Sequence, residues 1–201
     1  VQTCALPIFQ SWNPEVQKLI SRRQNNAKAE DNLRWLREHT QANRHVDLIA
    51  GLPGETLESF GAGFDRLVAL RPQEIQVGIL KRLRGAPIDR HTEAFDMRYN
   101  PSPPYNVLST RDIAFADMQR LARFARYWEL IGNSQRFEAH LPSLLGAQAF
   151  ARFMAFSDWV YARTDSTWRF APERLGQLID AWLVSPSEIE FHDGTTEKPR
   201  L

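Results

Sequence analysis

The sequence predicts an α/β fold for its first half and a helical region for its second half. Two apolar runs, ending at Ala50 and Leu80, alternate with segments whose apolar residues follow helical spacing. This alternation is typical of parallel strands that are covered by helices. Beyond about residue 101, we find only helical patterns and no convincing strand.

The elements of the first half are located from local signals. Asn13-Pro14 is a typical helix start, because Asn caps a first turn and Pro fits its first position. Arg71-Pro72 breaks the helix that precedes it. The expected elements are a helix from residue 14, a helix over 27–39, a strand over 45–50, a helix over 56–70 and a strand over 75–80.

In the second half, residues 100–105 mark a linker or an extended turn. Ser109-Thr110-Arg111-Asp112 resembles a capping box and predicts a helix that runs to Gly132. Further helices are expected over 147–163 and 172–184. Their aromatic residues are most simply core, and a cofactor box is the alternative. The last residues, 193–201, are polar without a period and predict a disordered tail.

The first eight residues, 1–8, resemble the translation of a sequencing adapter, and natural sequence then resumes near Phe9. The alternative is a genuine short N-terminal arm. Because the single cysteine, Cys4, lies in this segment, the rest of the chain offers no disulfide and no thiolate metal site. We therefore exclude residues 1–8 from the fold.

Composition limits the classes of function. The 201 residues are 43% hydrophobic and 24% charged, with a net charge of +1, which gives no electrostatic basis for binding nucleic acid or an anionic membrane. No apolar run approaches the roughly 20 residues that span a bilayer. Without usable cysteines the chain fits the reducing cytoplasm. The histidines are too scattered to predict a metal site.

The most informative motif is the turn between the strand that ends at Ala50 and the following helix. Gly51 and Gly54 allow positive φ values and close approach of the backbone to a ligand. Glu55 and Thr56 suit the first turn of a helix. The motif is neither a P-loop nor a dinucleotide fingerprint. A structural turn without a ligand is the alternative.

Several segments, taken in order, resemble the later strands of the radical S-adenosylmethionine (SAM) enzymes. They are residues 10–15, 47–55 and 76–81, followed by 103–108 and 127–134. The resemblance is to the branch with an N-terminal cobalamin-binding domain and a conserved helical C-terminal domain of unknown function. It implies the C-terminal part of a partial (β/α)6 TIM-type barrel over residues 9–100, followed by an all-helical region over 101–192.

The resemblance also implies a SAM site at the carboxyl ends of the strands. Gln10 and Ser11 would contact the ribose and methionine of SAM, since an amide and a hydroxyl supply suitable donors and acceptors. The adenine would be packed by Asp47, Ile49, Gly51, Leu52, Gly54 and Glu55, and its edge reached by Ile79, Leu80 and Lys81. Gly51→Val should then weaken SAM binding by at least about tenfold while the fold survives.

Two departures from the family pattern matter. Asp47 stands where the fifth-strand motif begins with Gly, and Glu55 is shifted by one position, so stabilisation of the helix start is its first interpretation. The three-cysteine cluster motif and the glycine-rich second strand are absent. We therefore expect the chain to be an inactive C-terminal fragment, with the cluster ligands and the cobalamin domain in missing N-terminal sequence.

The function that the resemblance implies is formation of a 5′-deoxyadenosyl radical, for methyl transfer or another radical reaction on an unknown substrate. The expected cofactors are SAM, a [4Fe–4S] cluster and cobalamin, and an electron-donor protein such as flavodoxin or ferredoxin is an expected partner. The alternative is a non-catalytic α/β module with a helical annex that binds a nucleotide or a partner. Lys81, Arg82 and Arg84 form either a solvated loop or a contact for an anionic group of the substrate.

Overall fold

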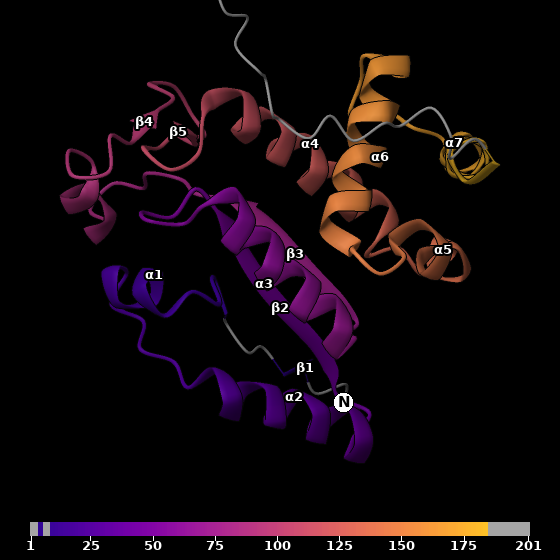
Figure 1. Ribbon diagram of the computed structural model, residues 1–201, viewed down its shortest axis with the longest axis horizontal. Coiled ribbons are helices and arrows are strands. Elements are labelled where there is room, and N and C mark those ends of the chain that lie inside the picture. The colour runs from indigo at the N-terminus through magenta and orange to yellow at the C-terminus, as the bar shows by residue number, and fades with distance from the viewer. Residues whose placement is uncertain (1–3, 6–8, 185–201) are drawn as a thin grey trace, which may run out of the picture.

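The computed structural model describes residues 4–5 and 9–184 (Figure 1). The first half contains β1 (Cys4–Ala5), α1 (Pro14–Leu19), α2 (Asn26–His39), β2 (Asn43–Ala50), α3 (Leu57–Leu70) and β3 (Glu74–Ile79). The second half contains β4 (Arg98–Tyr99), β5 (Val107–Ser109), α4 (Phe115–Ile131), α5 (Leu141–Leu145), α6 (Ala149–Thr164) and α7 (Pro172–Val184). Short 3-10 helices cover Pro87–His91 and Gln135–His140.

β2 is the centre of a parallel sheet with the order β1-β2-β3. It pairs with β3 from His45 opposite Glu74 to Ala50 opposite Ile79. On its other side a single bridge joins Gln10 to Leu48. The predicted strands over 45–50 and 75–80 are therefore confirmed, as is the helix between them, and the sheet is parallel as expected.

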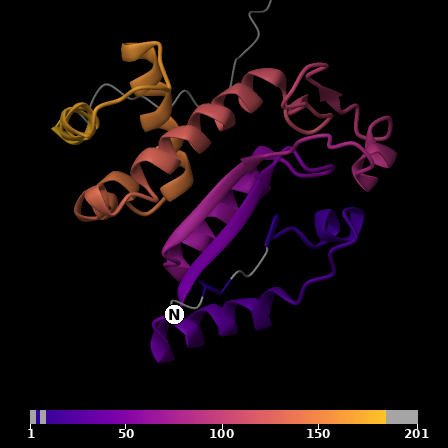
Figure 2. The same cartoon turned by 180° about the vertical axis from the view of Figure 1, so that it is seen from behind.

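The two faces of β2 differ in their surroundings. Val46, Leu48 and Ala50 are buried and belong to the same apolar core as Phe60, Phe64 and Leu67 of α3, which lies along this side of the sheet (Figures 1 and 2). The intervening side chains of β2 point to the opposite side and are half-buried. We call this second side the open face; it consists of His45, Asp47 and Ile49 of β2 with their partners Glu74, Gln76 and Gly78 of β3.

The helices of the second half cover the outer edge of β3. The Trp128 Nε1–H donates to the Ile75 carbonyl at 2.9 Å, and the Asn133 amide both accepts from the Ile75 N–H and donates to the Ile75 carbonyl at 3.1 Å. These side chains take the hydrogen bonds that a further strand would make, so the sheet ends here.

Aromatic rings join the two halves of the chain. Phe64 of α3 packs edge-on against Phe124 and Trp128 of α4, with ring centroids 5.0 and 4.7 Å apart. Phe153 of α6 contacts the same two α4 rings. The expectation that the aromatic residues of these helices are core is confirmed.

One predicted helix start is wrong. Ser109-Thr110-Arg111-Asp112 does not cap a helix: Ser109 ends β5, and α4 begins at Phe115. The Thr110 Oγ1 instead accepts from the backbone N–H groups of Asp112 and Ile113, and so closes a turn. Ser and Thr make such local bonds in turns as readily as at helix starts, which is why the pattern misled.

The second half is not entirely helical either. β5 pairs antiparallel with β4, and this small ribbon straddles the expected boundary at residue 100. The Val107 N–H also donates to the Leu80 carbonyl at 2.8 Å, which ties the ribbon to the end of β3. Of residues 1–8 only Cys4 and Ala5 are described, as β1, and the expected tail over 193–201 lies outside the described residues.

Candidate functional site

The turn after β2 has the backbone that its glycines predict. Gly51 and Gly54 have φ values of 85° and 76°, a region that favours glycine over other residues. The Glu55 N–H donates to the Leu52 carbonyl, and Thr56 then caps α3 in a reciprocal pair with Ser59. The predicted strand–loop–helix unit is present.

Gly51 does not border open space. A Cβ added there would lie 2.4 Å from Val107 Cγ1 and 3.2 Å from Met118 Cε. The position that a side chain at Gly51 would occupy is therefore filled by Val107 of β5 and Met118 of α4, and not by a ligand. The expectation that Gly51→Val spares the fold is wrong, because the sequence did not show that Val107 reaches this turn.

The side chains of Ser11 and Glu55 are buried and hydrogen-bonded to each other. Each is 1% exposed, and the Ser11 hydroxyl donates to the Glu55 carboxylate, which also accepts from the Ser59 hydroxyl. Burial raises the pKa of Glu55, although these hydroxyl groups act in the opposite direction. Glu55 thus fastens the chain at Ser11 to the first turn of α3, and its placement at the helix start agrees with our first interpretation.

The other expected SAM contacts divide between the core and the surface. Leu52 and Leu80 are buried, and Ile79 is half-buried. Lys81 is exposed, and its backbone forms a bridge with Asn106. Asp47 and Ile49 lie on the open face, and Gln10 joins the edge of β2 beside them: the Gln10 N–H donates to the Asp47 carbonyl and the Gln10 carbonyl accepts from the Ile49 N–H, both at 2.9 Å.

Gly78 completes this upper part of the open face, and sequence reasoning missed it. It lies opposite Ile49, and a Cβ added there would have no neighbour nearer than 3.9 Å. A side chain at Gly78 would therefore lie in ordinary contact with Ile49, in the upper part of the open face, which is the part nearest the carboxyl ends of β2 and β3. The period of two along β3 was the signal that could have found Gly78.

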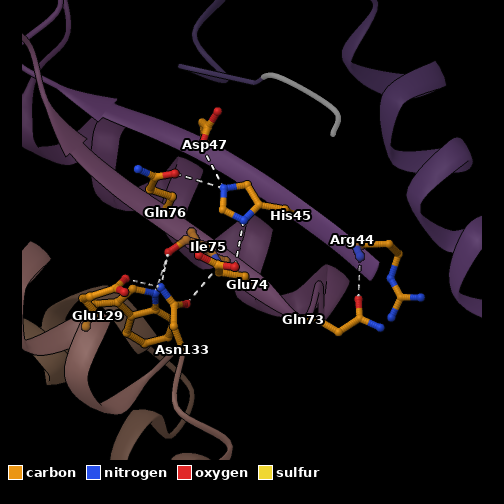
Figure 3. Close-up of polar contacts among 10 residues, drawn as sticks. Arg44, His45, Asp47, Gln73, Glu74, Ile75, Gln76, Glu129 and Asn133 are labelled. Carbon is orange, nitrogen blue, oxygen red and sulfur yellow. Dashed lines mark hydrogen bonds and ion pairs between the residues drawn. The ribbon is translucent and has the colours of Figure 1, made fainter. Parts of the chain in front are cut away.

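Toward the amino ends of β2 and β3, below Ile49 and Gly78, the open face carries a polar cluster around His45 (Figure 3). The His45 Nδ1 lies 2.8 Å from a Glu74 carboxylate oxygen, and its Nε2 lies 3.0 Å from Gln76 Oε1 and 3.2 Å from Asp47 Oδ1. Burial lowers the pKa of His45, but the hydrogen bonds to these three side chains and the charge of Glu74 outweigh it, so the pKa is raised. Both ring nitrogens face oxygen atoms, which favours the imidazolium.

His45 was expected to face away from a ligand because it lies at the amino end of its strand. Its side chain instead shares a face with Asp47 and Ile49. Among the described residues, no group of His, Cys, Asp and Glu side chains has the arrangement of a metal site. No helix in the described part of the chain is long and apolar enough to cross a membrane.

Comparisons with known proteins show similarity to a family model and to solved structures. A family model described as "Protein of unknown function (DUF4080)" matches residues 93–169, which include β4, β5 and α4–α6. The chain is also similar in structure to coproporphyrinogen III oxidase (HemN) from Escherichia coli, described as a radical SAM enzyme. The TM-score is 0.45 and the identity 20%, over 69% of this chain and 32% of that chain. No curated protein matches this sequence.

Proposed function

We propose that the chain is part of a radical SAM enzyme and that the upper open face holds the adenosyl group of SAM. The observation that carries this proposal is the half-buried pair of Ile49 and Gly78 at the carboxyl end of the open face, where Gly78 places no side chain beside Ile49. Flat apolar contacts with a few polar groups suit a nucleoside. Gln10 lies beside this part of β2, because its backbone bonds those of Asp47 and Ile49.

In this proposal the residues of the chain bind and orient SAM, which would supply the 5′-deoxyadenosyl radical, with methionine as the other product, on receiving one electron from an iron–sulfur cluster held by residues outside this sequence. Ile49 would pack on the adenine, and the Gln10 amide would hold the ribose hydroxyl groups. Ser11 and Glu55 would position Gln10 without touching SAM, because their polar groups already bond each other. His45, Glu74 and Asp47 likewise bond one another and would hold β2 to β3 beside the site.

The residues of this chain do not fit a [4Fe–4S] cluster. Such clusters are held by several cysteine thiolates, and the sequence has one cysteine, Cys4. We therefore assign no residue of this chain to a cluster and propose that residues outside this sequence supply its ligands. Use of cobalamin, and of flavodoxin or ferredoxin as an electron donor, remains a prediction from the sequence resemblance.

Ligand-observed NMR with SAM, 5′-deoxyadenosine and GTP tests the adenosyl site. We expect the full chain to bind the two adenosyl compounds and not GTP, and Gly78→Val to lower their affinity by at least about tenfold. Gly176→Val is the matched control, because Gly176 lies in α7, far along the chain in the helical region. Equal binding of GTP would favour a general nucleotide-binding module, and unchanged binding by folded Gly78→Val would contradict the site.

A further inference from the structure

A groove lies at the amino ends of β2 and β3, at the opposite end of these strands from the Gly51–Gly54 turn. Its volume is about 970 Å³, within the range of small-molecule sites. The last turn of α3, the start of β3, the end of α4 and α5 form its walls. Apolar side chains supply much of the lining: Val68, Pro72, Ile75, Trp128, Leu141 and Leu145.

One cationic side chain of this groove is almost completely buried. Arg44 is 6% exposed, and its Nε has no hydrogen-bond partner. Among residues 4–5 and 9–184, no carboxylate forms an ion pair with its guanidinium. Burial, and then the charge of Arg37, lower the pKa of Arg44. An anion in the groove would supply the hydrogen-bond partner that this Nε lacks.

The rest of the lining carries charges of both signs. Arg71, which ends α3 with a φ of 52°, contributes a second guanidinium. Glu138 is the carboxylate that lines the groove within the described part of the chain. The carbonyl groups at the ends of α3 and α4 each add about half a negative charge, which leaves the unpartnered Nε of Arg44 as the feature that favours an anion. An anionic group is therefore the complement of this site, and the apolar walls require an apolar body beside it.

We propose that this groove binds an amphipathic organic anion, a carboxylate or sulfonate whose charged group meets Arg44 and whose apolar body packs along Ile75, Trp128 and Leu145. The site is separate from the open face and does not depend on the function proposed for it. The backbone around Arg44 is held in place, because its N–H donates to Gln73 Oε1 at 2.9 Å and its carbonyl accepts from the Gln73 N–H at 3.1 Å (Figure 3).

The fluorescent sulfonate 8-anilinonaphthalene-1-sulfonate is the probe for this site. We expect saturable binding of one molecule per chain, displaced by decanoate but not by 1-decanol or inorganic phosphate. Arg44→Met should weaken binding by at least about tenfold. The same variant should unfold at an equal or higher temperature, because it removes a buried Nε that has no hydrogen-bond partner among the described residues. Arg34→Met is the control, since Arg34 lies on exposed α2 surface and pairs with Glu30.

Ala69→Trp provides a second variant that leaves the charge in place. Ala69 lines the groove from an exposed position of α3, so a large side chain there should block the probe without loss of stability. Displacement by decanol as effective as by decanoate would overturn the role of charge. Displacement by inorganic phosphate would show that an anion without an apolar body is sufficient, and would overturn the proposal of an amphipathic ligand. Unchanged binding by both variants would overturn the site itself.

Discussion

Along β2 the side chains that face α3 are Val46, Leu48 and Ala50, each at most 1% exposed, whereas the open face carries the half-buried His45, Asp47 and Ile49. Alternation along a strand places these two sets on opposite sides. The buried face unites the strands with the helices through apolar packing. The open face holds polar groups and, at Gly78, a position without a side chain. The proposed SAM site and the apolar core would thus use different faces of one strand.

The largest expected loss of stability comes from truncating Trp128 in the buried core. This residue is 4% exposed, packs on Phe64 and donates to the Ile75 carbonyl. Trp128→Ala should lower the free energy of unfolding by about 3–5 kcal/mol in urea denaturation. Trp35→Ala is the control, because Trp35 is 55% exposed on α2, and it should cost below about 1 kcal/mol. If Trp128→Ala also cost below about 1 kcal/mol, the second half would not stabilise the sheet.

A matched pair of glycine variants sharpens the difference between the packed turn and the open face. Gly51→Ala meets Val107 at 2.4 Å and keeps a positive φ, so it should lower the free energy of unfolding by about 1–3 kcal/mol. Gly78→Ala meets nothing nearer than 3.9 Å and should change it by less than about 0.5 kcal/mol. Thermal and urea unfolding of the two variants measure the difference. Equal destabilisation would mean that the open face is also packed.

Local patterns were sufficient to predict the elements that carry these two faces. Asn13-Pro14, the turn at Gly51 and the helical spacing of Phe60 and Phe64 each depend on neighbours close in sequence, and each was located correctly. The ribbon at Val107 was not found, because its short strands are fixed by pairing with Leu80 and not by a pattern of their own.

The site was predicted less completely, for the same physical reason. Ser11 was expected to contact a ligand, and its hydroxyl instead bonds Glu55, which is 44 residues away. No periodicity shows such a pair. His45 and Gly78 were within reach of sequence reasoning, because alternation alone places them with Asp47 and Ile49 once the register of β2 and β3 is known.

The smallest expected effect concerns the polar part of the open face. Because the folded state raises the pKa of His45, its hydrogen bonds to Glu74, Gln76 and Asp47 stabilise the fold most when the imidazole is protonated. This contribution is fully present below the unfolded pKa near 6.5 and is lost as pH rises through the folded pKa. His45→Gln should therefore cost stability at pH 6, by less than about 1 kcal/mol, and cost less at pH 9. His39→Gln, at the exposed end of α2, serves as the control in the same thermal unfolding series. A loss that is equal at both pH values, or larger at pH 9, would show that the imidazolium does not hold the two strands together on this face.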